Sequence, residues 1–129
     1  MLWRIEPDSA IPIYEQIVAQ VIFGVASGSL EAGALIPSVR DLAGRLTVHP
    51  NTVARAFQEL ERQGVVTARR GRGMEVTADA LKLCQERRQE ILRSRIRDVL
   101  REAVSSALPD DDIRKLVEEE LTHVNSLTK

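Results

Sequence analysis

Seven arginines in the middle of the chain are the residues best suited to chemistry with a charged partner. Residues 38–77 carry these seven arginines against four acidic residues, a balance of +3, whereas residues 1–37 balance at −3 and residues 78–129 at −1. The net charge of −1 for 129 residues therefore conceals one basic segment. A planar guanidinium donates two parallel hydrogen bonds, which suits phosphate groups and guanine edges. The charge balance alone does not identify a nucleic-acid-binding surface, because a solvated helix face can carry the same balance.

Other residue types that often mark functional sites give weaker signals. The sequence has no glycine-rich phosphate loop, nucleophile elbow or pair of catalytic carboxylates, so we expect no enzymatic activity and no cofactor. The single cysteine, Cys84, excludes an intramolecular disulfide and a multi-cysteine zinc site, and we interpret it as structural. Three aspartates at 110–112 and His123 have metal-ligating side chains. Acidic residues also stabilise the start of a helix, so we assign no metal site.

Aromatic residues and long apolar runs are scarce. With 3% aromatic residues, the chain lacks the side chains for a surface of stacked bases. The longest apolar stretch, near residues 21–26, is far shorter than the roughly 20 residues that span a membrane. The first residues show no basic region followed by an apolar one, so we expect no secretory signal. These features predict a soluble, cytoplasmic protein without a membrane partner.

The basic segment lies after a first predicted helix, and a second predicted helix starts at its first residues. Pro12 opens a first helix with a broad apolar stripe, which ends at Gly28. Residues 2–5 alternate weakly and are compatible with a short strand or an extended arm. Ser38 is a favoured N-cap for a second helix, from residue 39 to about residue 46, and Asp41 completes an approximate capping box.

A third helix and a hairpin complete the predicted order. The third helix starts at Pro50, after a tight connection, and ends near Gly64. Two β-prone runs, 65–69 and 74–77, flank a glycine-bearing turn and predict a hairpin. We expect the first turn of the third helix to present free backbone N–H groups and short polar side chains to a phosphate. Helix, helix, tight turn, helix and hairpin is the order of a winged helix-turn-helix.

After residue 77 the pattern becomes that of long helices. Pro109 separates two of them, and we divide the chain into a DNA-binding part, 1–77, and a helical dimerisation part, 78–129. Such a pair cannot enclose much core of its own, so its apolar stripe needs a partner, for which we favour a second copy of the chain. We assign this dimer interface to Leu92, Ile96, Val99, Leu100, Ala103, Val104, Leu116 and Leu121.

Several motifs resemble those of the GntR family of bacterial transcription regulators. They are Ile11–Ile17, Gly28–Leu30 with Gly33, Ile36–Ala43, Val48–Leu60, Gly64–Val66 and Arg70–Gly73. Together they cover roughly residues 9–77 in consistent order and spacing. The short all-helical tail and the Pro-Asn-Thr-Val of the third helix are similar to the YtrA-type branch of the family, which lacks a larger effector-binding domain.

The resemblance implies DNA-binding roles for individual residues. In this family the segment that begins at Pro50 is the recognition helix in the major groove, and the wing tip reaches the minor groove. Many relatives carry arginine at position 50, and some carry one where this chain has Ala54, so Arg55 is the available cation here. We assign the DNA-binding surface to Ser38, Arg40, His49, Asn51, Thr52, Arg55, Arg69, Arg70, Gly71 and Arg72.

Simpler interpretations apply to one of these residues, His49, and to two further arginines of the basic segment. His49 is as compatible with capping the third helix as with donating to a phosphate. Arg45 and Arg62 are expected to be solvated or in local ion pairs.

We therefore predict a mainly α protein with a small β-hairpin, an N-terminal winged helix-turn-helix and a C-terminal two-helix dimerisation segment. Its expected function is a homodimeric, sequence-specific DNA-binding regulator, a repressor of a near-palindromic operator. Control of a transporter operon is implied by the resemblance alone, and no effector is assigned. Two alternatives remain open: a sensor gated by a metal or small ligand at the C-terminal helices, and a winged-helix module that binds another protein.

Overall fold

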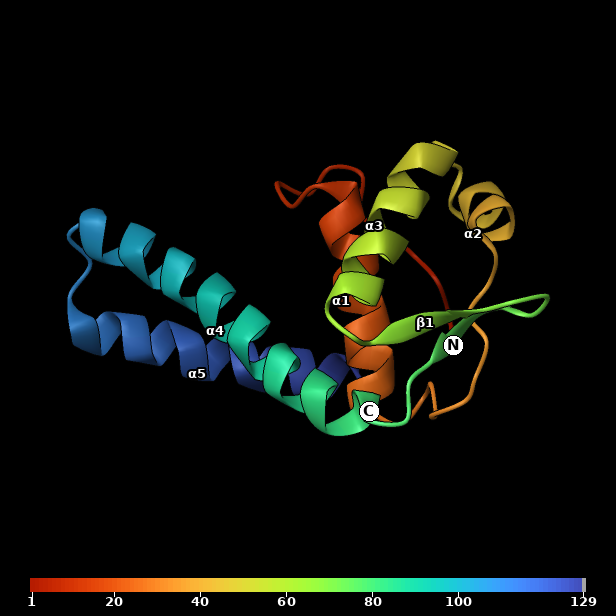
Figure 1. Ribbon diagram of the computed structural model, residues 1–129. Helices are drawn as coiled ribbons and strands as arrows, with labels where there is room; N and C mark the ends of the chain where they lie inside the picture. The colour runs from red at the N-terminus through yellow and green to blue at the C-terminus, as the bar shows by residue number, and fades with distance from the viewer. Residues whose placement is uncertain (129) are drawn as a thin grey trace. The chain divides into compact units, whose positions relative to one another are not determined.

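The computed structural model describes residues 1–128 of the chain. Its elements, in order, are α1 (Ile13–Ala26), α2 (Val39–Leu46), α3 (Pro50–Arg62), β1 (Val66–Arg69), β2 (Gly73–Val76), α4 (Ala80–Ser105) and α5 (Asp110–Leu127) (Figure 1). This confirms the predicted fold class, mainly helical with one antiparallel hairpin. No helix in the described part of the chain is both long and apolar enough to cross a bilayer.

The chain divides into two compact units, residues 1–91 and the residues from Leu92 onward. The first unit extends beyond the predicted boundary at residue 77 because Ala80 and Cys84, on the first two turns of α4, are fully buried in its core. The assignment of residues 1–77 to DNA binding and 78–129 to dimerisation concerns function and stays a prediction.

The core of the first unit forms where α1 packs against α3. Ile17 and Val21 on α1, Leu42 on α2, and Val53 and Leu60 on α3 are fully buried. The buried positions of α3 recur at the spacing of one helix face, as the sequence predicts. The core therefore fixes which face of α3 is left for solvent.

The N-terminal residues form an arm held along α1 by two glutamines. The Gln20 side chain accepts from the Arg4 amide at 3.1 Å and donates to the Arg4 carbonyl at 2.8 Å. One turn earlier, Gln16 Oε1 accepts from the Glu6 amide at 2.8 Å. Residues four apart lie on one helix face, so both glutamines reach the same extended segment. The choice left open between strand and arm is thereby decided in favour of the arm.

The connection between α2 and α3 is tight. Ser38 Oγ accepts from the Asp41 amide at 3.1 Å, which confirms the predicted N-cap of α2. At the other end of α2, Thr47 lies in the left-handed region with φ 54°. This conformation is unfavourable for a β-branched residue, but it reverses the chain within three residues and places the start of α3 next to α2.

The hairpin is anchored to a third extended segment. Val66 pairs with Val76 and Arg69 with Gly73 across the two strands. Beyond β2, the Ile36 amide donates to the Met74 carbonyl at 3.0 Å and the Val76 amide to the Ala34 carbonyl at 2.8 Å. Residues 33–36 thus pair with the outer edge of β2, so the base of the hairpin is held on both sides.

The second unit contains the end of α4 and α5, joined by a turn at Ala107 with φ 66°. Ile113 is buried, and together with Leu100, Val104 and Val117 it lines an apolar groove of about 420 Å³. Asp110, Arg114 and Glu118 also line this groove. The predicted break at Pro109 is confirmed, since Pro109 is the N-cap of α5.

Candidate nucleic-acid interface

The start of α3 is capped by His49. Its Nδ1 atom accepts a hydrogen bond from the Asn51 amide at 3.0 Å, so in the neutral ring the proton sits on Nε2. The interpretation of His49 as a cap is therefore correct for Nδ1, while Nε2 keeps an N–H group for another partner. His49 and Asn51 are exposed, and Thr52 is half-buried.

The expectation that free backbone amides face a phosphate here is wrong. Pro50 has no N–H, the Asn51 amide donates to His49 Nδ1, and the Thr52 amide donates to the His49 carbonyl at 3.0 Å. The imidazole cap occupies the Asn51 amide that a phosphate would need. The donors available at this helix start are thus side chains, chiefly those of His49, Asn51 and Thr52.

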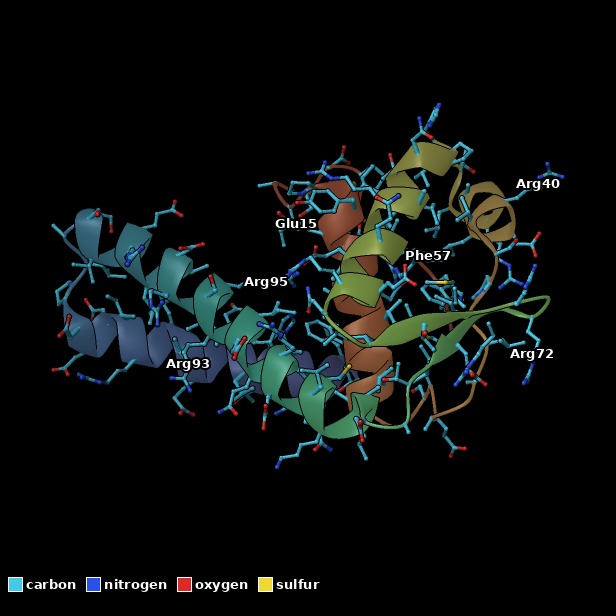
Figure 2. The ribbon with its side chains drawn as sticks, viewed as in Figure 1. Glu15, Arg40, Phe57, Arg72, Arg93 and Arg95 are labelled. Atoms are coloured by element: carbon cyan, nitrogen blue, oxygen red, sulfur yellow. The ribbon has the colours of Figure 1, made fainter. Side chains whose placement is uncertain are left out.

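Arg40 projects from the first turn of α2 into solvent. It is exposed and has no ion-pair partner among residues 1–128. Figure 2 shows Arg40 and Arg72, a residue in the turn of the β1–β2 hairpin that forms the wing, extending toward the same side of the view and away from α1. Ser38 lies two residues before Arg40. Its side-chain oxygen accepts the capping hydrogen bond of α2, which leaves the hydroxyl hydrogen free to donate.

The arginines of the wing, which is the hairpin of β1 and β2 with its turn, differ in their surroundings. Arg69 Nε lies 2.6 Å from Glu75 Oε2, and Arg72 Nη1 lies 4.0 Å from Glu75 Oε1. Arg70 and Gly71 are exposed at the tip, and Arg70 has no ion pair within the described residues. Gly71 has φ 77°, a conformation natural to glycine, and a Cβ there would meet open space, so its role is conformational.

Glu75 is a functional candidate that the sequence analysis missed. The register pairs Thr67 with Glu75 and Arg69 with Gly73, so Arg69 and Glu75 are diagonal neighbours on one face of the hairpin. The Glu75 side chain is only 13% exposed. The sequence does show an acidic residue two positions after the predicted glycine-bearing turn. Its pairing with Arg69, however, follows only from the strand register, which the sequence did not reveal.

Arg55 is held by an aromatic ring. Its guanidinium carbon lies 3.8 Å from the centroid of the Tyr14 ring, a cation–π contact between α3 and the first turn of α1. Arg55 is exposed and Tyr14 is half-buried. Sequence analysis singled out Arg55 but not the ring that carries it, because 41 residues separate the two positions.

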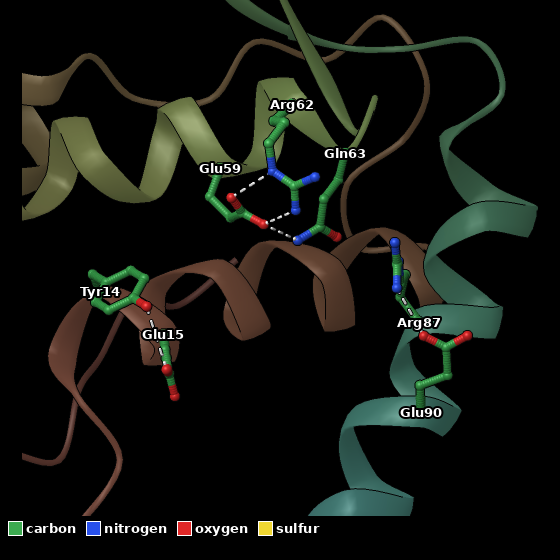
Figure 3. Close-up of polar contacts among 7 residues, drawn as sticks. All are labelled: Tyr14, Glu15, Glu59, Arg62, Gln63, Arg87 and Glu90. Carbon is green, nitrogen blue, oxygen red and sulfur yellow. Dashed lines mark hydrogen bonds and ion pairs between the residues drawn. The ribbon is translucent and has the colours of Figure 1, made fainter.

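Arg62, by contrast, is neutralised locally, as predicted. Its Nε donates to Glu59 Oε2 at 2.9 Å, its Nη2 contacts Glu59 Oε1, and Gln63 Nε2 donates to the same carboxylate at 2.8 Å (Figure 3). The hydrogen bonds from Arg62 and Gln63 lower the pKa of Glu59 from its ordinary 4.5 to about 2. This end of α3 therefore offers no free positive charge.

The residues assigned to dimerisation form an apolar surface on the second unit. Leu92, Ile96, Val99, Val104, Leu116 and Leu121 are between 41% and 64% exposed, and Leu100 and Ala103 are half-buried. Val117, Val124 and Leu127 are also exposed and extend the same apolar character along α5. Within residues 1–128, no group of three or more histidine, cysteine, aspartate or glutamate side chains is arranged to hold a metal.

Residues 13–76 match the family model described as bacterial regulatory proteins, gntR family. The chain is 31% identical over 116 residues to the HTH-type transcriptional repressor YtrA of Bacillus subtilis (strain 168), a match that covers 90% of this chain and 89% of that protein. A GntR family transcriptional regulator from Listeria monocytogenes has a TM-score of 0.70 at 32% identity, covering 87% of this chain and 97% of that one.

YtrA from Sulfolobus acidocaldarius, a GntR-family transcription factor, has a TM-score of 0.56 at 28% identity, covering 94% of this chain and 97% of that one. These similar proteins are regulators of transcription and not enzymes, in agreement with the expectation that this chain has no enzymatic activity.

Proposed function

The chain belongs to the GntR family of bacterial DNA-binding transcriptional regulators, in its YtrA-type branch, and on that premise we propose that it is a repressor that binds a near-palindromic operator as a homodimer. The observation that supports this DNA surface best is a pair of exposed arginines, Arg40 on α2 and Arg70 at the wing tip, which have no ion-pair partner among residues 1–128. Because bacterial operators are chromosomal, we place the protein in the cytoplasm.

Each exposed side chain near the start of α3 has a contact that suits its chemistry. Asn51 is suited to adenine, to which its amide group can make two hydrogen bonds in the major groove. Thr52 is suited to a thymine methyl group or a phosphate. His49 Nε2–H and the Ser38 hydroxyl are suited to backbone phosphates, which fix the position of the helix without reading sequence.

The wing is suited to the minor groove. Arg70 is free to enter a narrow groove, where the negative potential is strongest, and Gly71 lets the backbone approach the duplex. Arg69 uses Nε to bind Glu75, so its two terminal nitrogens remain available to phosphates. Arg72, more loosely held by the same carboxylate, flanks the tip.

The proposed occupant of the apolar surface on the second unit is a second copy of the chain. The part of α4 that begins at Leu92 contains four arginines and two acidic residues, whereas α5 contains six acidic residues and two basic ones. A two-fold arrangement can place the basic helix of one copy beside the acidic helix of the other, with the exposed apolar residues between them. Dimerisation makes the second half-site contact effectively intramolecular, so each winged helix needs only modest affinity.

Binding-site selection from random duplex DNA with the wild-type protein tests the repressor model. We expect two inverted half-sites, since a two-fold dimer reads a near-palindrome. Footprinting of the region upstream of the chain's own gene, and of neighbouring transporter genes if present, then locates the operator. Recovery of a single unpaired half-site would contradict a symmetric dimer, and a footprint that leaves transcription in vitro unchanged would contradict repression.

Val99→Asp tests the dimer without disturbing the single chain, because Val99 is 64% exposed and lies outside the hydrophobic core cluster of the described residues. We expect monomers by analytical ultracentrifugation and weak operator binding. Ser94→Asp is the matched control, since it adds the same charge five residues away, about 140° around the helix. Dimers of wild-type stability in Val99→Asp, or equal dissociation in both variants, would overturn the assigned interface.

A further inference from the structure

The cation–π contact between Tyr14 and Arg55 links α1 to the exposed face of the proposed recognition helix. Building on the DNA interface proposed above, we propose that Tyr14 is a positioning residue for DNA binding: its ring holds the Arg55 guanidinium so that the edge of that group donates to a backbone phosphate beside α3. The ligand is thus a phosphate diester of the operator, and Tyr14 acts through Arg55.

The stacking geometry leaves the arginine able to bind. A guanidinium carbon 3.8 Å above a ring centroid contacts the ring through its flat face. All five N–H groups of a guanidinium lie in its plane and point outward from its edge. Stacking therefore uses the face and leaves the donors free, and within the described residues no carboxylate forms an ion pair with Arg55. Glu15, whose carboxylate accepts from the Tyr14 hydroxyl at 3.4 Å, is the acid adjacent to this pair.

Arg55 lies on the face of α3 that the core leaves open. It is four residues after Asn51, and residues at this spacing are neighbours on one helix surface. Val53, Ala56, Phe57 and Leu60 point the opposite way, into the core. An arginine at this position lies beside the side chain best suited to a base edge, which is where a positioning contact to phosphate is useful.

The ring is a rigid support. Tyr14 is half-buried and packs against the hydrophobic core, on the first turn of the helix that packs along α3. A free arginine side chain loses much rotamer freedom when it binds, and a pre-held one loses less. Arg55 is thereby ordered before DNA arrives.

Four variants and two readouts test this role. Tyr14→Leu keeps apolar bulk but removes the ring, Tyr14→Phe keeps the ring as the conservative control, and Arg55→Ala removes the cation; the fourth combines Tyr14→Leu with Arg55→Ala. DNA affinity is measured on the duplex recovered by selection, and thermal unfolding is measured in parallel. We expect Tyr14→Leu to weaken binding about 2- to 5-fold per half-site, the size of an exposed cation–π contact, and Tyr14→Phe to bind as wild type.

The double variant is expected to bind no more weakly than Arg55→Ala alone, because the ring has no effect without its cation. If Tyr14→Leu lowers the melting temperature but leaves affinity unchanged, the contact only joins two helices and the inference is wrong. It is also wrong if Arg55→Ala binds as wild type while Arg40→Ala binds weakly, a result that leaves the proposed DNA interface intact. If neither arginine variant loses affinity, the interface itself is wrong.

Discussion

The salt dependence of DNA binding offers the sharpest test of the assigned surface, and Arg40 is its best probe. The Arg40 side chain is exposed and has no ion-pair partner within residues 1–128, so Arg40→Ala removes one available positive charge without breaking a contact of the protein. Each phosphate neutralised by a cation contributes about 0.9 to the slope of log affinity against log salt concentration. A dimer presents the residue twice, so we expect the slope to fall by about 1.8.

This change is large enough to measure. Between about 50 and 200 mM salt, a slope difference of about 1.8 changes the ratio of wild-type to variant affinity about 12-fold. Fluorescence anisotropy on a labelled duplex follows it directly, and any duplex serves for the comparison because phosphate contacts persist on non-specific DNA. Arg70→Ala at the wing tip is expected to behave in the same way.

Arg45 provides the matched control. It is also an exposed arginine of α2 without an ion pair in the described chain, but it lies five residues along, about 140° around the helix from Arg40. We expect Arg45→Ala to leave the slope within experimental error of wild type. If Arg45→Ala lowers the slope as much as Arg40→Ala, net charge alone governs binding and the assignment of a specific surface is refuted.

Three further outcomes follow from the contacts described. Glu59, with its pKa lowered to about 2 by the hydrogen bonds of Arg62 and Gln63, stabilises the fold above its ordinary pKa of 4.5, and this contribution disappears as the pH falls through about 2. Glu59→Gln should therefore cost about 1 kcal/mol at neutral pH, a figure reduced for the solvent screening of the exposed Arg62, and the difference from wild type in urea unfolding should vanish near pH 2. Glu75→Gln removes the acid beside Arg69 and should tighten binding to non-specific duplex DNA while lowering the preference for the selected site; weaker non-specific binding would contradict it. Thr47→Gly relieves the left-handed conformation and should raise stability by about 1 kcal/mol by thermal unfolding, and a lower melting temperature would show that φ 54° is not strained.

Local signals in the chain predicted most element boundaries. Ser38 caps α2, Pro50 opens α3 and Pro109 precedes α5, as expected, because a cap is a contact between residues two to four apart that a short stretch of sequence already contains. The buried face of α3 followed for the same reason, from apolar residues at helical spacing.

Contacts between distant segments could not be predicted in this way. The pairing of Arg69 with Glu75 depends on hairpin register, and the stacking of Arg55 on Tyr14 depends on how α1 crosses α3. The same holds for the pairing of residues 33–36 with β2. Those residues show no strand pattern, and only the fold brings them to the open edge of β2.

The amino-acid sequence by itself determined the order of the winged helix-turn-helix and the concentration of arginine within it, because composition and helical periodicity are properties of the chain alone. Only the tertiary structure decided which of those arginines keep a free charge. Within the described part of the chain Arg40 and Arg70 form no ion pair, whereas Arg62 and Arg69 contact carboxylates and Arg55 contacts a ring. The physical reason is that the field at a guanidinium depends on groups within a few ångströms of it, and folding chooses those groups.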